Sequence, residues 1–252
     1  MSKYVYGARI TPHKPKLCRP SPPTVGSGFS LPPAAASADL RHLCTYVANQ
    51  GQTSKCVGEG FAGAAWVATR GAGKRFSETG IYVGARVRER LRQSDPIPDT
   101  GSNPSDAADS LVAMGAYPRD SRDDDLSQVD ALDSWLETTE TQLFQPSDIC
   151  PIGAGDLSTV DSFLSAGVGF PVVNWMDVDQ SFENIADSNV WNGRVGPVLG
   201  GHCTVLVGFD SISYWLWNSW GLSWGVNGFA RIARNVVASQ CGLCAVVGGP
   251  VL

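Results

Sequence analysis

The chain lacks any apolar run long enough to cross a membrane, and its N-terminus lacks the pattern of a secretory signal. The runs FAGAAWVA and CAVVGGPVL have the length of core segments, well below the roughly 18 apolar residues that a spanning helix needs. The N-terminal sequence MSKYVYGARITPHKPKLCRP mixes charges with prolines, where a signal peptide needs an uninterrupted apolar core. We therefore expect a soluble, cytoplasmic protein with no membrane partner.

An excess of positive charge is also missing. The 19 Lys and Arg residues are outnumbered by 24 Asp and Glu residues, and no basic stripe with interleaved aromatic residues is visible. Proteins that bind nucleic acid usually carry such a basic surface. Nucleic acid is therefore not an expected partner.

The cysteines do not form the dense, even-numbered framework of a small secreted domain. Seven cysteines are scattered over 252 residues, and we expect most of them to be reduced. Cys241 and Cys244 have the spacing of half a zinc site, but no second pair of ligands stands at a matching spacing. We interpret them as two packed core cysteines and expect neither a metal nor a cofactor.

Residues 1–38 lack any helical or alternating period. They are rich in Pro, Gly, Ser and Ala, which is typical of an extended arm. Such an arm is compatible with disorder, with a tail that binds a partner protein, or with a plug over a cleft. Residues 39–252 have the pattern of a folded protein, and the chain's 43% hydrophobic residues suffice for one large domain or two packed lobes.

Residues 39–145 show mainly helical patterns. Helices are predicted over 56–70, 77–93 and 103–115, and a further one over 123–140 from the spacing of Leu126, Val129, Leu132 and Leu136. The acidic residues that open this last segment favour a helix N-terminus over a metal site. Three glycines in 56–70 suggest close packing against a neighbouring element.

Residues 146–252 change to short runs of β-branched and aromatic residues. Strands are predicted over 170–175, 202–210, 214–220 and 229–234. No internal repeat and no regular alternation of strands with helices is visible. The sequence therefore predicts an α+β protein, with a mainly helical lobe (39–145), a mainly β lobe (146–252) and a cleft between them.

Cys56 stands where a reactive thiol would be favoured. It opens the predicted glycine-rich helix, and the positive end of a helix stabilises a thiolate. Thr53 or Ser54 is expected to cap that helix, and Lys55 is interpreted as an exposed lysine. The position suits a nucleophile better than a site within the helix would.

A thiolate nucleophile needs a base, and the chain has three histidines. His13 lies in the arm and His42 follows Arg41, whereas His202 begins an apolar strand in LGGHCTVLVGFD. Asn218 ends the next predicted strand, where its amide can orient the imidazole ring. Trp220 can shield that hydrogen bond from water.

Three sequence blocks carry a resemblance to a known family. The segment from Gln50 to Cys56, then GGHCTVLVGFD, then WNSWGLSWGVNGFARI look like the signature blocks of papain-like cysteine peptidases. The order of the blocks and the distance from Cys56 to His202 are similar to those of the family. IYVGARVRERL followed by DTGSNPSDAADSLVAMGAYP resembles the bacterial and phage branch, so the likeness extends over residues 39–240.

The resemblance implies a two-lobed papain-like fold with the active site in the cleft. It implies that Cys56 is the nucleophile, His202 its base and Asn218 the residue that orients the histidine, with Gln50 in the oxyanion hole. It further implies a substrate cleft with Asp99, Gly101 and Ser102 on one wall and with Gly200 and Gly201 on the other. Trp220 is a further candidate substrate-binding residue.

Three positions depart from the secreted members of the family. Thr53 replaces a disulfide cysteine, Lys55 a small residue and Val57 an aromatic residue. The loss of the disulfide cysteine agrees with a reducing compartment or with release only at lysis. The three changes together leave the cleavage preference open. An arm of this length is also shorter than the helical prodomain of secreted relatives, so we expect no zymogen control of that kind.

Three functions are compatible with these residues. The first is a cysteine peptidase that hydrolyses polypeptides through an acyl-enzyme. The second is an amide hydrolase acting on cell-wall peptides, although no accessory module for binding a cell wall is visible. The third is a catalytically idle papain-like scaffold, such as a virion interaction protein, against which the intact Cys56, His202, Asn218 and Gln50 argue.

Overall fold

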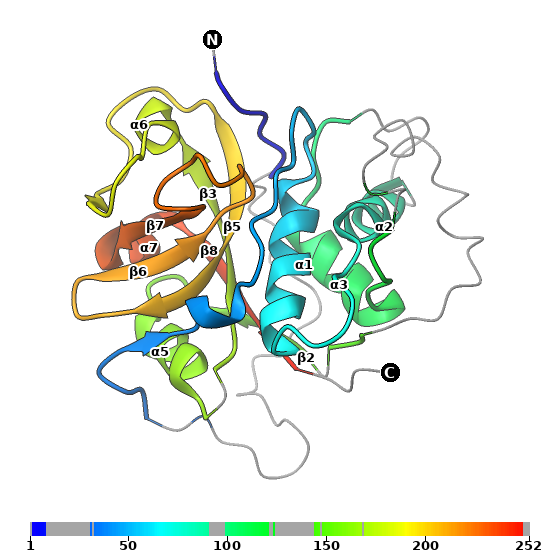
Figure 1. Cartoon of the computed structure of the whole chain (residues 1–252), viewed down its shortest axis with the longest axis horizontal. Coiled ribbons are helices and arrows are strands. Elements are labelled where there is room, and N and C mark those ends of the chain that lie inside the picture. The colour runs from blue at the N-terminus through cyan, green and yellow to red at the C-terminus, as the bar shows by residue number, and fades with distance from the viewer. Residues whose placement is uncertain are drawn as a thin grey trace.

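The computed structural model describes residues 2–8, 31, 33–90, 99–120, 123, 144–146, 148–167 and 169–248. Three helices lie side by side on one side of the molecule, and a large twisted sheet forms the other side (Figure 1). The N-terminal segment runs between these two parts. This arrangement confirms the predicted α+β class.

The three helices are α1 (Cys56–Ala68), α2 (Glu78–Arg90) and α3 (Pro104–Met114). They confirm the helices predicted over 56–70, 77–93 and 103–115, as far as the described residues extend. Asn103 caps α3 by accepting a hydrogen bond from the Ser105 backbone N–H at 3.0 Å. The helix predicted over 123–140 lies outside the described residues except for Asp123.

Helix α1 packs directly against the sheet because its glycines leave room for neighbouring side chains. A Cβ atom at Gly60 would lie 2.7 Å from Cys203 Sγ, and one at Gly63 would lie 3.2 Å from the Trp217 ring. The prediction that these glycines mark close packing is confirmed. The helix that begins with Cys56 is thereby pressed onto the strand that contains His202.

The sheet has eight strands among the described residues, in the order β2-β8-β3-β5-β6-β7-β4, with β1 on β5. The strands are β1 (Ala38–Asp39), β2 (Asp148–Ile152), β3 (Val172–Val178), β4 (Val190–Trp191), β5 (Gly200–Phe209), β6 (Ser213–Trp217), β7 (Phe229–Ala233) and β8 (Gly242–Val247). All pairings are antiparallel except that of β4 with β7. The four predicted strands correspond to β3, β5, β6 and β7.

Short helices complete the β-rich part. They are η1 (Arg41–Leu43), α5 (Leu157–Ser165), α6 (Gln180–Glu183) and α7 (Arg234–Gln240). None of the helices in the described part of the chain has the length and apolar character needed to span a bilayer. Cys241 and Cys244 are both buried, which confirms their interpretation as packed core cysteines.

Candidate active site

Cys56 is the first residue of α1, and its side chain is fully buried. Lys55 is the N-cap residue and provides no side-chain cap, so the expectation that Thr53 or Ser54 would cap the helix is wrong. Their hydroxyls instead donate to backbone carbonyls, at 2.7 and 3.3 Å. The positive end of α1 is therefore not neutralised by either hydroxyl and remains directed at the thiol.

His202 and Asn218 form a hydrogen-bonded pair beside α1. His202 Nε2 lies 2.7 Å from Asn218 Oδ1. The same oxygen accepts the Ser219 backbone N–H at 2.8 Å, which identifies it as the carbonyl oxygen of the amide. His202 Nε2 therefore carries the hydrogen. Nδ1 has no hydrogen-bond partner among the described residues, which leaves it as the basic nitrogen.

Aromatic rings shield the His202–Asn218 pair from water. The Trp220 ring stacks on the His202 ring with centroids 4.2 Å apart, and Phe182 approaches it edge-on at 6.1 Å. His202 is 1% exposed and Asn218 is 3% exposed. Because water is excluded, the hydrogen bond that orients the imidazole is stronger than it would be at the surface.

The backbone of β5 brings the thiol and the imidazole to the same place. The backbone N–H of Cys203, the residue that follows His202, acts to lower the pKa of the Cys56 thiol. Helix α1 and strand β5 also approach closely beside these residues, since a Cβ atom at Gly60 would lie 2.7 Å from Cys203 Sγ. The residues predicted from separate sequence blocks meet at one point of the fold.

Gln50 is held in a fixed orientation at the same point. Its Oε1 accepts the Ser219 hydroxyl at 2.8 Å, and its Nε2 donates to the Thr53 carbonyl at 2.8 Å. The Nε2 group also donates to the Val5 carbonyl at 3.2 Å. The side-chain amide of Gln50 thus already binds a peptide carbonyl oxygen near Cys56.

Residues 2–8 lie in the cleft between the two lobes, and we call them the arm segment. The Gly7 carbonyl accepts the Ser102 N–H at 2.8 Å, and the Ala8 N–H donates to the Gly201 carbonyl at 2.9 Å. The arm segment therefore bridges Ser102 on one wall and Gly201 on the other. A substrate would have to use the same space.

Glycines in the walls allow this close approach. A Cβ atom at Gly101, which has φ +87°, would lie 2.1 Å from the Gly7 carbonyl oxygen, and one at Gly200 would lie 2.5 Å from the Tyr6 Cβ. Asp99 behaves differently, because its carboxylate accepts the Ser54 N–H at 3.2 Å and the Tyr82 hydroxyl at 2.6 Å. Its observed bonds brace the wall and do not reach the arm segment.

Two tyrosines of the arm segment cover the histidine. The Tyr4 ring stacks on Trp220 with centroids 4.0 Å apart, and the Tyr6 ring meets His202 edge-on at 6.3 Å. Together with Trp220 and Phe182, they surround the imidazole with apolar surface. The arm segment thus contributes to the burial of the catalytic candidates.

This burial favours the neutral forms of both groups. Desolvation raises the pKa of the Cys56 thiol to about 12, although the backbone N–H groups of Cys203, Gly7, Ala8 and Val57 oppose the shift. Desolvation also lowers the pKa of His202 to about 4, with the bond to Asn218 acting in the opposite direction. With the arm segment in place, the pair is a thiol and a neutral imidazole at neutral pH.

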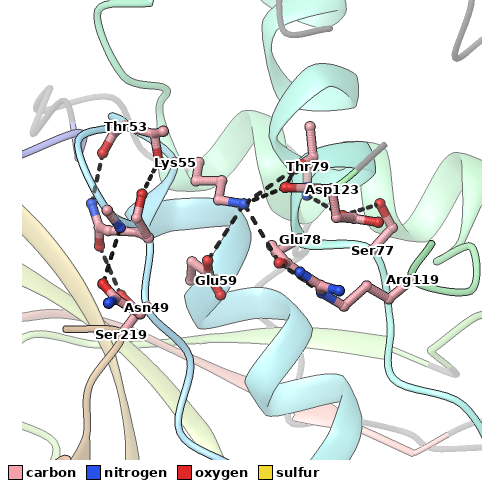
Figure 2. A network of polar contacts seen from close by, with 12 residues as sticks. Asn49, Thr53, Lys55, Glu59, Ser77, Glu78, Thr79, Arg119, Asp123 and Ser219 are labelled. Carbon is pink, nitrogen blue, oxygen red and sulfur yellow. Dashed lines mark hydrogen bonds and ion pairs between the residues drawn. The ribbon is translucent and has the colours of Figure 1, made fainter. Parts of the chain in front are cut away.

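Lys55 is buried, so its interpretation as an exposed lysine is wrong. Its Nζ lies 3.5 Å from Glu78 Oε1 and 3.7 Å from Glu59 Oε1, and it donates to the Asp123 carbonyl at 3.1 Å (Figure 2). Arg119 pairs with Glu78 at 3.1 Å. Burial of Lys55 places its charge next to the acidic groups of Glu59 and Glu78, which would otherwise be buried with fewer cationic partners.

This network joins the starts of two helices. Asp123 Oδ1 accepts the Thr79 N–H at 3.1 Å and the Ser77 hydroxyl at 2.7 Å, at the first turn of α2 (Figure 2). Lys55, the residue before Cys56, connects Asp123 at the start of α2 to the start of α1. The sequence offered no signal for this role, because Glu78 and Asp123 are distant along the chain.

Glu183 is a second residue that the sequence did not single out. It is 3% exposed and contacts the arm segment at the cleft. It stands in the polar stretch QSFENIADSN, which has the composition of an ordinary surface turn. No motif or spacing in that stretch distinguishes this carboxylate from its neighbours.

Comparison with solved structures identifies the fold as the papain-like two-lobed fold. Xylellain, a cysteine protease from Xylella fastidiosa, superposes with a TM-score of 0.68 at 16% identity over 98% of this chain and 96% of that one. The bromelain protease from Ananas comosus superposes with a TM-score of 0.62 at 15% identity, over 84% of this chain and 99% of that one. At these identities the likeness concerns the fold.

The sequence comparisons agree with that class. Residues 165–250 match the model of the family "Papain family cysteine protease". This range includes His202 and Asn218, whereas Cys56 and Gln50 precede it.

Curated relatives match over part of their length. Silicatein from Petrosia ficiformis is 32% identical over 41% of this chain, and fruit bromelain from Ananas comosus is 33% identical over 35%. A gut-specific cysteine proteinase from Caenorhabditis elegans is 43% identical over 25% of this chain. The matches span 31%, 26% and 20% of these relatives' own lengths.

Proposed function

We propose that this protein is a cysteine peptidase that hydrolyses polypeptides, with Cys56 as nucleophile and His202 as its base. The observation that carries the proposal is the convergence of three groups on one carbonyl-binding point. Cys56 is the first residue of α1. His202 Nε2 lies 2.7 Å from Asn218 Oδ1, which orients the ring, and Gln50 Nε2 donates to the Val5 carbonyl oxygen at 3.2 Å.

In the proposed reaction, the Cys56 thiolate forms a C–S bond with the scissile carbonyl carbon. The oxygen that becomes negative accepts hydrogen bonds from Gln50 Nε2 and the Cys56 backbone N–H. The C–N bond then breaks as the His202 imidazolium gives its proton to the leaving amine. Water, deprotonated by His202, attacks the thioester and breaks the C–S bond, which releases the acid and regenerates the thiol.

Hydrolysis of a mixed fluorogenic peptide library in reductant tests this proposal. The full chain is compared with Cys56→Ala, which should show no cleavage above background. Cleavage that persists in Cys56→Ala would contradict the assignment of the nucleophile. If neither protein cleaves any peptide, cell-wall peptides are the next substrates to test, and inactivity on these too would favour the idle scaffold.

Gln50→Ala is expected to lower kcat by about a hundredfold while KM changes little, because Gln50 stabilises charge that develops in the transition state. The measurement is steady-state hydrolysis of a peptide that the wild type cleaves. Asn49→Ala, one residue earlier in the same loop, provides a control. A loss confined to KM would contradict an oxyanion role for Gln50.

The arm segment, in the same proposal, is an internal plug of the active site. The Val5 carbonyl accepts a hydrogen bond from the Gln50 side chain, and the Tyr6 ring packs against the His202 ring. The backbone of the arm segment is hydrogen-bonded to Ser102 on one wall and to Gly201 on the other. The pKa directions of Cys56 and His202 support this role, because a buried neutral pair is poorly nucleophilic. Substrate must displace the arm segment before the thiolate can form.

Alkylation of Cys56 in the full chain is expected to accelerate about tenfold for each pH unit between about pH 6 and pH 9. The reason is the direction of the shift, since a thiol with its pKa raised to about 12 is protonated over that whole range. Iodoacetamide labelling followed by peptide mapping measures this rate. A plateau below about pH 7 would show instead that a thiolate already exists beside His202.

The chain is also proposed to act in a reducing compartment such as the cytoplasm. The six cysteines within the described residues are free thiols, as expected for such a compartment. Its placement in the bacterial and phage branch of the family is supported by the resemblance of the segment IYVGARVRERL. Association with a virion, or release at lysis, is a further prediction of the sequence.

A further inference from the structure

Glu183 is a buried carboxylate at the end of α6 that the catalytic proposal does not use. It is 3% exposed. Among the described residues outside the arm segment, its side-chain donor is Gln180 Nε2, at 2.7 Å from Oε2. Burying a carboxylate with one donor is unfavourable, because its oxygens can accept several hydrogen bonds. The arm segment contacts this carboxylate, so the chain that covers Glu183 also has to supply further donors to it.

The arm segment supplies the missing donors. The Ser2 hydroxyl donates to Glu183 Oε1 at 2.5 Å, the Lys3 N–H donates to Oε2 at 3.2 Å and the Tyr4 N–H donates to Oε1 at 3.4 Å. The Tyr6 hydroxyl makes a further hydrogen bond to Oε1. Two side-chain hydroxyls and two backbone N–H groups thus satisfy the carboxylate.

Glu183 is ionised when these donors are present. Burial alone would raise its pKa, but the hydrogen bonds from Ser2, Tyr6, Lys3 and Gln180 together lower the pKa below its ordinary value. A negative group in this position attracts hydrogen-bond donors and cations, and it repels carboxylates.

The position of Glu183 defines which part of a substrate it would meet. The neighbouring Phe182 ring lies 6.1 Å from the His202 ring and 5.6 Å from the Trp220 ring. Since His202 gives its proton to the leaving amine, the residues after the scissile bond depart over this end of the cleft. Glu183 therefore faces the leaving-group side.

We infer that Glu183 is the specificity-determining residue of a subsite that binds hydroxyl or cationic side chains on the leaving-group side of a peptide substrate. The subsite rejects acidic side chains at the same position. This inference rests on the proposed peptidase function, and the arm segment is the intramolecular occupant of the subsite. A substrate that displaces the arm segment must replace its donors.

The first test uses matched fluorogenic peptides that carry Lys, Tyr, Phe or Glu at the first or second residue after the scissile bond. The full chain should favour Lys over Glu by about a hundredfold in kcat/KM, and Tyr over Phe by about tenfold. Glu183→Gln should reduce the Lys preference to less than about threefold, and Glu183→Lys should reverse it. Asp187→Asn removes an exposed charge in the following loop and should leave both ratios unchanged.

A second test measures binding without catalysis. The full chain carrying Cys56→Ala and Gly7→Ala, a change expected to displace the arm segment, is titrated with the synthetic peptide SKYVYGA. Glu183→Gln in this background should weaken binding by about tenfold. Replacing Ser2 and Tyr6 of the peptide by Ala and Phe should weaken its binding to the protein that retains Glu183. The same replacements should not change its binding to the Glu183→Gln protein, because the acceptor of both hydroxyls is already altered there.

The two tests separate the inference from the peptidase proposal. If no peptide is cleaved, the peptidase proposal fails, and the titration still decides whether Glu183 binds donors. Equal affinity of SKYVYGA for the Glu183 and Glu183→Gln proteins would overturn the inference. Unchanged Lys-to-Glu ratios in a cleaving Glu183→Gln enzyme would overturn it too. Thermal unfolding of each variant verifies that the compared proteins are folded.

Discussion

Gly7→Ala is expected to raise kcat/KM on short peptides by about a hundredfold in the full chain. A Cβ atom at this position would lie 1.7 Å from the Ser54 carbonyl oxygen, which belongs to the backbone before α1 and cannot give way. The arm segment must therefore leave the cleft. It then loses its backbone hydrogen bonds to Ser102, Gly201 and Gln50.

The size of the effect follows from those lost contacts. The bonds to Ser102, Gly201 and Gln50, at about 1 kcal/mol each, give about 3 kcal/mol, or roughly a hundredfold in the population of the open state, and loss of the bonds to Glu183 acts in the same direction. The packing of Tyr4 and Tyr6 on Trp220 adds to this. Steady-state hydrolysis and the iodoacetamide rate at Cys56 should both increase.

Gly153→Ala is the matched control for this prediction. A Cβ atom at Gly153 meets nothing within 4 Å, so the same substitution adds a methyl group without moving any segment. Wild-type activity is expected for this variant. A Gly7→Ala protein that is folded yet no more active than wild type would show that the arm segment does not limit access to the site.

Lys55→Met is expected to lower the free energy of unfolding by about 3 to 5 kcal/mol at about pH 9, where Glu59 is ionised, because it removes the cation paired with Glu59 and leaves Glu78 with Arg119 alone. The side chains of Lys55, Glu59 and Glu78 are 4%, 4% and 3% exposed. Urea unfolding followed by tryptophan fluorescence measures the loss. Lys55→Arg should retain most of the stability, because it keeps the charge.

The pH dependence of this loss identifies its cause. Burial, and then the charge of Glu78, raise the pKa of Glu59 to about 8, while Lys55 lowers it. A carboxyl group whose pKa is raised on folding holds its proton more tightly in the folded state, so stability falls as pH rises from about 4.5 to about 8. Lys55→Met raises the pKa of Glu59 further and extends that fall to higher pH, so its cost should be largest above about pH 8 and smaller near pH 5.

Lys74→Met removes the same charge from an exposed position and is the control for Lys55→Met. It is expected to change the free energy of unfolding by less than about 0.5 kcal/mol. A similar small loss in Lys55→Met would mean that the carboxylates are satisfied without the lysine. Peptidase activity in Lys55→Met would then also be expected to match the wild type.

Much of the fold could be predicted because its signals are local. Helix α1 begins at Cys56, as the glycine-rich run indicated, and β5 and β6 follow the apolar runs on either side of the turn after Phe209. Short elements such as β4 and α6 were missed. Strands of two residues and helices of four carry no periodicity that a sequence pattern can reveal.

Lys55 shows where local reasoning fails. A lysine next to a helix start is usually solvated, and the residues that bury this one come from α2 and from Asp123, far along the chain. The capping expectation for Thr53 and Ser54 failed for a similar reason, because their hydroxyls found carbonyl acceptors in the folded loop. Neither acceptor could be identified from the neighbouring residues.

The sequence by itself determined which chemical groups are present and in which blocks they stand. It indicated Cys56 at a helix start, His202 on a strand, and Asn218 and Trp220 after the next one, because these signals depend on adjacent residues. The tertiary structure decided that the arm segment lies across the cleft, that Lys55 is buried and that Glu183 faces the bound chain. Those outcomes depend on packing and desolvation between distant segments, which no local pattern encodes.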